Sequence, residues 1–287
     1  MSRLAIEGGD PVRTDPFPPW PYFYEDEKRA VQEVLDSGKV NYWTGSLGMD
    51  FQDRFAQYCG AAFGIAVCNG TAALHVALAA ANIGPGDEVI VPARTFIASA
   101  SAVLNQNAIP VFADVDPESH TIDPKSVASL VNDRTRGVIA VHLAGHPAEM
   151  DPLMEIADTH GLVVIEDAAQ AHGAEYRGRK VGSLGHLAAF SFCQDKIFTT
   201  GGEGGMVTTS DEEMARTART FKDHGCLEEE RRSLLEMEQL YTYIHHRMGY
   251  NYRMTEMQAA IGLKALDRLD WNVEIRRRNA HHLKKQL

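Results

Sequence analysis

Short apolar runs alternate along the chain with segments that are long enough to form helices. The apolar runs predict strands over residues 65–68, 88–92, 109–115, 137–142, 162–167, 187–190 and 206–209. Helix-length segments lie among them over 25–37, from 70, from 95, and over 124–131, 150–159, 212–222 and 255–266. Apolar strands separated by helices predict an α/β fold: a three-layer αβα arrangement with a mostly parallel sheet covered on both faces.

A lone lysine and a group of glycines follow the strand predicted at 187–190. Lys196 comes shortly after this strand, and glycines fill most of the range 201–205 before the next strand. A lysine at a buried strand end is costly unless it is neutral, paired or covalently engaged. Glycines allow backbone to come close to a flat ring or to phosphate oxygens. The alternative is a surface lysine on a hairpin.

A carboxylate ends another apolar strand, about thirty residues upstream. The run Val163–Ile165 is followed by Glu166 and Asp167. In parallel sheets, functional side chains gather at the carboxyl ends of strands. Pyridoxal 5'-phosphate needs a lysine amine for covalent attachment and an acidic partner for its ring nitrogen. The combination of Lys196 with Asp167 therefore suits this cofactor.

A glycine and a threonine stand where the strand at 65–68 turns into an alanine-rich helix. Gly70 and Thr71 occupy this turn. The first amides of a helix have no partner inside the helix, so they offer a site for an anion such as a phosphate. Any turn from a strand into a helix offers the same amides, so this signal alone is weak.

The two ends of the chain differ from its middle. Residues 1–24 are rich in proline and aromatic residues, which predicts an extended arm lying on the body or on a neighbouring molecule. Residues 25–270 form the predicted large domain, and 271–287 begin a further helix.

The aromatic turn Tyr42–Gly45 has two interpretations, a packed loop or a segment that faces the substrate.

Composition narrows the class of protein. The 287 residues are 44% hydrophobic, which is enough for one large core, and their net charge of −11 argues against a nucleic-acid partner. No apolar run approaches the length of a membrane span, and the N-terminal residues resemble no secretion signal. The four cysteines lack CxxC spacing, so we expect no metal site and no disulfide framework. A reduced, cytoplasmic protein is the simplest expectation.

Three segments together resemble one family. They are the aspartate segment 163–170, the lysine segment 191–205 and the turn and helix over 249–262. They are similar to motifs of the DegT/DnrJ/EryC1/StrS family, which are fold-type-I aminotransferases acting on keto sugars and cyclitols. The similarity runs from about Trp20 to the end of the chain. The resemblance implies the large, pyridoxal-phosphate-binding domain of these enzymes.

The resemblance also implies roles for single residues. Lys196 and Asp167 would be the catalytic residues: Lys196 would carry the cofactor, and Asp167 would keep its ring nitrogen protonated. Gln170 would bond the ring hydroxyl, and Phe96 would lie over the ring. The phosphate would be held by Gly70, Thr71, Ser191 and, from a neighbouring subunit, Asn251. A homodimer with shared active sites follows from this last role.

The implied reaction moves an amino group from glutamate or glutamine to a keto sugar nucleotide or a keto-cyclitol. Such steps belong to amino-sugar, polysaccharide or antibiotic biosynthesis. One branch of the family has histidine in place of the lysine and dehydrates its substrate, so Lys196 favours transamination. Family members continue into a C-terminal small domain, and residues 271–287 match the start of the helix that leads to it; we expect that domain to be absent here. The alternatives are a dehydrating or aromatising enzyme of the same family and a truncated binding protein without catalysis.

Overall fold

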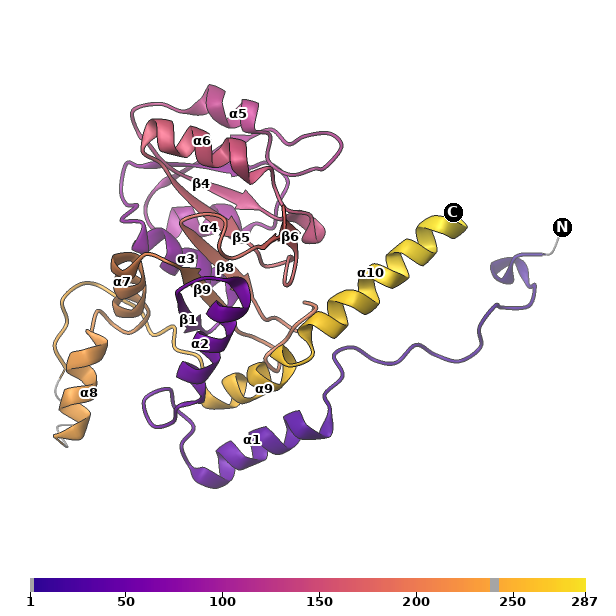
Figure 1. The fold of residues 1–287 in the computed structure, drawn as a ribbon, viewed down its shortest axis with the longest axis horizontal. Helices are drawn as coiled ribbons and strands as arrows, with labels where there is room; N and C mark the ends of the chain where they lie inside the picture. Colours follow the sequence, from indigo (N-terminus) through magenta and orange to yellow (C-terminus); the bar gives the residue numbers. More distant parts are fainter. Residues whose placement is uncertain (1–2, 238–242) are drawn as a thin grey trace.

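A sheet of seven strands forms the centre of the protein (Figure 1). The computed structural model describes residues 3–237 and 243–287. The sheet strands are β1 (Phe63–Val67), β2 (Glu88–Pro92), β3 (Ile109–Ala113), β4 (Thr135–Val141), β5 (Val163–Asp167), β8 (Leu187–Ser191) and β9 (Gly205–Thr209). A small hairpin of β6 (Glu175–Tyr176) and β7 (Arg179–Lys180) lies outside it.

The strand order in the sheet is β1-β9-β8-β5-β4-β2-β3. β9 pairs antiparallel with β1 and with β8, and the remaining neighbours pair in parallel. The prediction of a mostly parallel sheet is confirmed. Because β5 and β8 are parallel neighbours, their carboxyl ends lie at the same edge of the sheet. Asp167 ends β5, and the lysine loop begins directly after β8.

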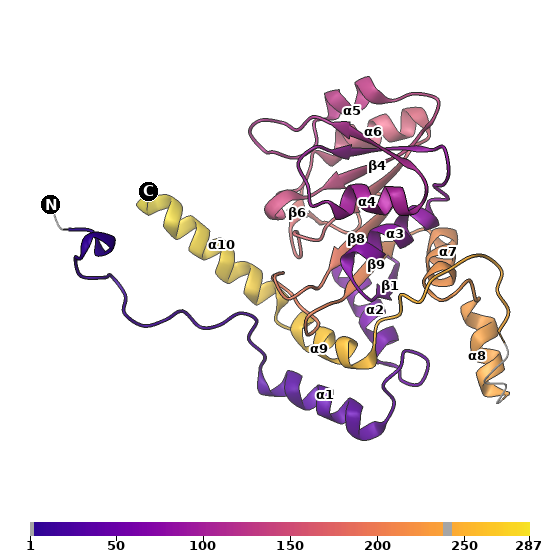
Figure 2. The same ribbon diagram turned by 180° about the vertical axis from the view of Figure 1, so that it is seen from behind.

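Helices cover both faces of the sheet, as Figures 1 and 2 show from opposite sides. One face carries α3 (Gly70–Ala80), α4 (Ala98–Asn105) and α7 (Glu212–Lys222), and the other carries α2 (Leu47–Cys59), α5 (Pro124–Leu130) and α6 (Met150–His160). Alternate strand residues face opposite ways, so Val164 and Ala188 join one apolar cluster while Ile165 and Ala189 join the other. The three-layer prediction is confirmed.

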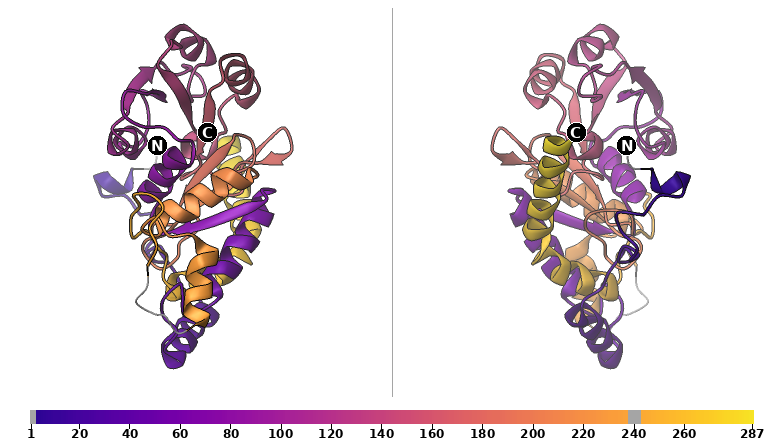
Figure 3. Two further views of the ribbon diagram at one scale, coloured as in Figure 1. Left: turned by 90° about the vertical axis from the view of Figure 1, so that its left-hand side faces the viewer. Right: turned by 90° about the vertical axis from the view of Figure 1, so that its right-hand side faces the viewer.

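The terminal segments extend from this body. α1 (Glu25–Ser37) packs on α9 (Glu256–Leu266), and α10 (Leu269–Gln286) runs outward from the end of α9 (Figure 1). Figure 3 shows α10 on the side opposite to α7 and α8 (Glu228–Glu236). The arm before α1 is largely exposed, and the Trp20 indole N–H donates to the Gln194 carbonyl over 2.7 Å.

Several local predictions differ from the structure. The arm contains one 3-10 turn, η1 (Ala5–Glu7), where an extended segment is predicted. The charged segment at 228–232 lies outside the predicted helices. It is the start of α8, in which Arg232 and Glu228 pair one turn apart at 2.6 Å. α2 and the β6–β7 hairpin are not among the predicted elements. None of the described helices is both long and apolar enough to span a membrane.

The aromatic turn at 42–45 packs inside its own chain. Tyr42 is buried, and Lys222 Nζ lies 4.0 Å from the centre of its ring. Lys222 Nζ also donates to Gln52 Oε1 and to the Ala66 carbonyl, at 2.9 and 3.2 Å. The Trp43 indole donates to Asp223 over 2.7 Å. Within one chain, the packed-loop interpretation therefore describes this turn.

We expect Lys222 to make stability depend on pH. Burial lowers the pKa of its amine from 10.5 to about 7. Between these two values the unfolded chain binds more protons at this group than the folded chain does, so its contribution to stability rises with pH. The stability advantage of the wild type over Lys222→Met should therefore grow between pH 7 and 9, by at most about 1.4 kcal/mol per pH unit.

Urea unfolding of both proteins at each pH measures this difference. Lys125→Met, at an exposed position on α5, is the matched control and should show a difference that does not change with pH. A constant difference for Lys222→Met as well would contradict the buried, neutral amine.

Candidate active site

A cavity of about 360 Å³ lies at the carboxyl ends of β5 and β8, beside the first turn of α3. Its lining includes seven of the eight residues singled out from the sequence: Gly70, Thr71, Phe96, Asp167, Gln170, Ser191 and Lys196. These residues come from segments that are far apart in the chain. The crossover connections of the sheet bring them to one edge.

Lys196 lies in a loop that is closed on itself. At its base, the Phe192 amide donates to the Gly204 carbonyl over 2.7 Å, and Gln194 donates to Gly202 over 3.0 Å. Gly201 and Gly202 have φ values of 94° and 131°, which side chains rarely tolerate. Phe198 is buried in the core beneath the loop. The loop is therefore anchored on both sides of the lysine, whose side chain is half-buried in the cavity wall.

Asp167 is held by two hydrogen bonds. Ser99 Oγ donates to Asp167 Oδ2 over 2.7 Å, and the Ala169 amide donates to Oδ1 over 3.2 Å. Ser99 Oγ lies 2.7 Å from Thr95 Oγ1, so a chain of hydroxyls from the start of α4 orients the carboxylate. This arrangement fixes both oxygens while the side chain remains at the cavity.

The carboxylate of Asp167 has no ion-pair partner among the residues that the structure describes. Burial raises the pKa of its carboxyl above the usual range, against the opposing effect of the hydrogen bonds from Ser99 and Ala169. A buried acid of this kind gains from a cation placed against it. The protonated ring nitrogen of pyridoxal phosphate would be such a cation, so the site fits the cofactor.

The neighbouring carboxylate, Glu166, has a different environment because alternate strand residues face opposite ways. Its oxygens accept from the Gly182, Leu184 and Gly185 amides at 2.8–2.9 Å. His142 Nδ1 accepts from the Ala148 amide, so Nε2 carries the proton and donates to Glu166 over 2.9 Å. Although burial opposes it, hydrogen bonding to His142 holds the pKa of Glu166 below its usual value. Glu166 therefore has a structural role in the core, while Asp167 lines the cavity.

The start of α3 lies directly against the end of β8. The Asn69 side chain accepts the Ala72 amide over 2.8 Å, which leaves the first amides of the helix for another acceptor. A Cβ at Gly70 would lie 2.5 Å from Ser191 Cβ, so only glycine allows this approach. The Ser191 hydroxyl and the amides of Gly70 and Thr71 thus meet at one corner of the cavity. This corner suits a phosphate.

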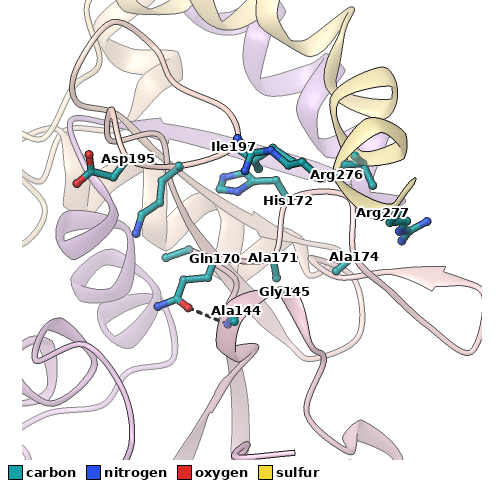
Figure 4. A pocket seen from close by; sticks show the side chains of 13 residues that line it. Ala144, Gly145, Gln170, Ala171, His172, Ala174, Asp195, Ile197, Arg276 and Arg277 are labelled. Carbon is teal, nitrogen blue, oxygen red and sulfur yellow. Dashed lines mark hydrogen bonds between the residues drawn. The ribbon is translucent and has the colours of Figure 1, made fainter. Parts of the chain in front are cut away.

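Gln170 is oriented by a strained backbone position. Its Oε1 accepts the Ala144 amide over 2.8 Å (Figure 4), and Ala144 has a φ of 51°. Because an amide N–H must donate to oxygen, this contact directs the Gln170 NH₂ group toward other acceptors in the cavity. Phe96 also lines the cavity and is 67% exposed, so its ring is free to cover a flat group.

Asn251 is the predicted site residue that the fold does not bring to the cavity. It is exposed, and its backbone bridges to Asp223, directly after the end of α7. Its role at the site of a neighbouring subunit stays a prediction.

Sequence reasoning missed three residues that organise the site. Ser99 and Thr95 orient Asp167, and Ala144 orients Gln170. A serine within an alanine-rich helix carries no motif of its own. The one available signal was position, since Thr95 and Ser99 are one helical turn apart directly after a predicted strand end.

The fold and this site define the large domain of a fold-type-I, pyridoxal-phosphate-dependent enzyme. The model of the DegT/DnrJ/EryC1/StrS aminotransferase family matches residues 21–287. The chain belongs to this family, whose aminotransferases depend on pyridoxal phosphate. The expected membership, fold and cofactor are confirmed.

Several relatives have functions of their own. The chain is 46% identical over 256 residues to a GDP-perosamine synthase of Caulobacter vibrioides, covering 88% of this chain and 65% of that protein. It is 44% identical over 294 residues to an L-glutamine:2-deoxy-scyllo-inosose aminotransferase of Streptomyces paromomycinus, covering 100% of this chain and 69% of that protein. The structure of an aminotransferase from Psychrobacter cryohalolentis matches with 52% identity and a TM-score of 0.83, covering 88% of this chain and 64% of that one. The chain thus spans about two thirds of each relative.

Proposed function

We propose that this protein transfers an amino group from glutamate or glutamine to a keto sugar nucleotide or a keto-cyclitol, with pyridoxal phosphate as cofactor. The observation that carries the proposal is the convergence of Lys196, Asp167 and the first turn of α3 in one cavity. The family membership supports the reaction class. The predicted cytoplasmic location stays a prediction.

The cofactor, when bound, supplies a ring that accepts electrons from the substrate carbon. Lys196 would hold it and, once released, would move a proton at the α-carbon of the donor with its Nζ amine. Asp167 would hold the proton on the ring nitrogen, with Ser99 and Ala169 keeping its oxygens in place. Gln170 would orient the ring through its NH₂ group, and the corner at Gly70 would bind the phosphate.

The substrate classes follow from the relatives. One of them is a synthase of a GDP-linked amino sugar, and another is an aminotransferase of a cyclitol ketone with glutamine as donor. Cofactor-loaded protein should convert a panel of such ketones to amines, and mass spectrometry should find the amine product together with the 2-oxo acid from the donor. Loss of water without amine transfer would instead support the dehydratase alternative. Absence of turnover with every ketone would leave the non-catalytic alternative.

We further propose a homodimer in which each active site uses Asn251 from the partner chain. The exposed position of Asn251, outside its own chain's cavity, supports this arrangement. A two-fold interface repeats each contact, so a dimer would hold two shared sites.

Mixed dimers provide the test of the shared site. Lys196→Ala and Asn251→Ala chains, each inactive alone, are unfolded together and refolded. If Asn251 acts on the partner's site, a hybrid dimer has one site with both defects and one with neither. Random pairing makes roughly half of the dimers hybrids, so about a quarter of wild-type activity should return. If Asn251 served its own chain, every hybrid site would carry one defect, and no activity above that of the parents would return.

A further inference from the structure

A second cavity, of about 470 Å³, opens beside the first (Figure 4). The two cavities share Ala169, Gln170, Asp195 and Lys196 in their walls. The far wall of the second cavity is formed by α10, through Arg276 and Arg277. A molecule that reaches Lys196 through this cavity therefore has its other end close to these two arginines.

The two arginines have no carboxylate partner among the described residues. Arg276 lies over the Trp20 ring, 5.5 Å from its centre, and Arg277 donates to the Gly173 carbonyl over 3.5 Å. Most other arginines of the described chain pair with an acid, as Arg268 does with Asp26. In a chain of net charge −11, two guanidinium groups without an acid at one cavity wall favour an anionic ligand.

His172 adds a buried polar group to the same cavity. It is 4% exposed, and neither ring nitrogen has a hydrogen-bond partner among the described residues. Its ring packs against Phe190, Phe192 and Phe198, at centroid distances of 5.6–6.0 Å. Figure 4 shows the imidazole between Gln170 and the arginines of α10. A buried imidazole without partners is costly, so His172 adds an unsatisfied polar group to this wall of the cavity.

Asp195 is the acid that lines the same cavity. Figure 4 shows its carboxylate directed away from His172 and from the arginines. The positive and the uncharged donor groups thus lie at one end of the cavity, and the acid lies at the other, near Lys196.

We propose that the second cavity binds the anionic end of a substrate whose reacting carbon lies at Lys196. The ligand chemistry is an oxyanion held by Arg276 and Arg277, with His172 in the wall behind them. It has two possible sources: the carboxylate of an amino-acid donor or the phosphate of a nucleotide-linked ketone. This inference rests on the proposed function for the nature of the substrate, and on the cavity itself for the anion.

Calorimetric titration tests the subsite without any turnover. The probes are 2-oxoglutarate, which has no amino group to transfer, and GDP, which has no sugar. Arg276→Gln and Arg277→Gln should each weaken binding of one probe about tenfold, and the double variant about a hundredfold. The probe that loses affinity identifies the source of the anion.

Arg278→Gln is the matched control, because Arg278 is on the same helix but does not line the cavity. Unchanged affinity of both probes in the double variant would overturn the subsite, and so would an equal loss in Arg278→Gln, which would indicate a general charge effect. Covalent labelling of Lys196 by cofactor, measured in the same samples, tests the proposed function separately. A wild-type protein that binds probe but is not labelled would refute that function and leave the subsite standing.

Discussion

Lys196→Ala should lower amino transfer by about a thousandfold or more, because the variant loses both the amine that holds the cofactor and the base that moves the proton. The side chain is half-buried in the cavity wall and is not part of the apolar core, so folding should be unaffected. Steady-state assays with donor and ketone measure the loss, and circular dichroism checks the fold.

Two comparisons make the lysine prediction specific. Lys125→Ala, at an exposed position on α5, should retain wild-type activity. Methylamine added to Lys196→Ala should restore part of the lost rate, since a free amine can replace the missing base. If Lys196→Ala kept more than about a tenth of wild-type turnover, Lys196 could not be the catalytic lysine.

Asp167→Asn should slow turnover about a hundredfold or more. Removal of one positioned electrostatic group commonly costs about 2–4 kcal/mol in the chemical step. The asparagine should be tolerated, because the Ser99 hydroxyl can accept from its NH₂ group and donate to Thr95 instead. Asp114→Asn, at an exposed position after β3, is the matched control and should be as active as the wild type.

The same variant has an expected effect on stability with the opposite sign. Burial raises the pKa of Asp167 in the folded chain, so the folded protein loses stability as pH rises and this group ionises. Without cofactor, Asp167→Asn should therefore have a higher melting temperature than the wild type at neutral pH. Each kcal/mol gained in the free energy of unfolding should raise it by about 2–4 °C. Added cofactor should raise the melting temperature of the wild type by more than it raises that of Asp167→Asn. Near-normal turnover in the variant, or a larger cofactor-induced gain in its melting temperature, would argue against a charge partner for the ring.

The alternation of apolar strands and helices was sufficient to predict the layers and the mostly parallel sheet. β2 and α7 have the predicted bounds. The highly charged segment at 228–232 is not among the helices predicted from the sequence. Its helix, α8, is supported instead by pairs such as Arg232 with Glu228, which contribute without any apolar pattern.

The site residues that directly follow strands could be predicted from the sequence. The contacts that depend on tertiary packing could not. Lys196 and Asp167 lie at the carboxyl ends of two neighbouring parallel strands, so their proximity could be predicted from the sequence. The hydroxyl chain through Ser99 and the carbonyl contact of Gln170 with Ala144 depend on how α4 and the loop after β4 approach β5. Contacts of that kind follow from tertiary packing, which no local pattern specifies. The cavity at Arg276 and Arg277 depends in the same way on the direction of α10.

The most direct test of the account is the position of the cofactor on the chain. Protein saturated with pyridoxal phosphate is reduced with borohydride, digested, and mapped by mass spectrometry. We expect a pyridoxyl group on Lys196 of the wild type and no pyridoxyl group at this position in Lys196→Ala. Label on a different lysine of the saturated wild type, or no label at all, would contradict the account.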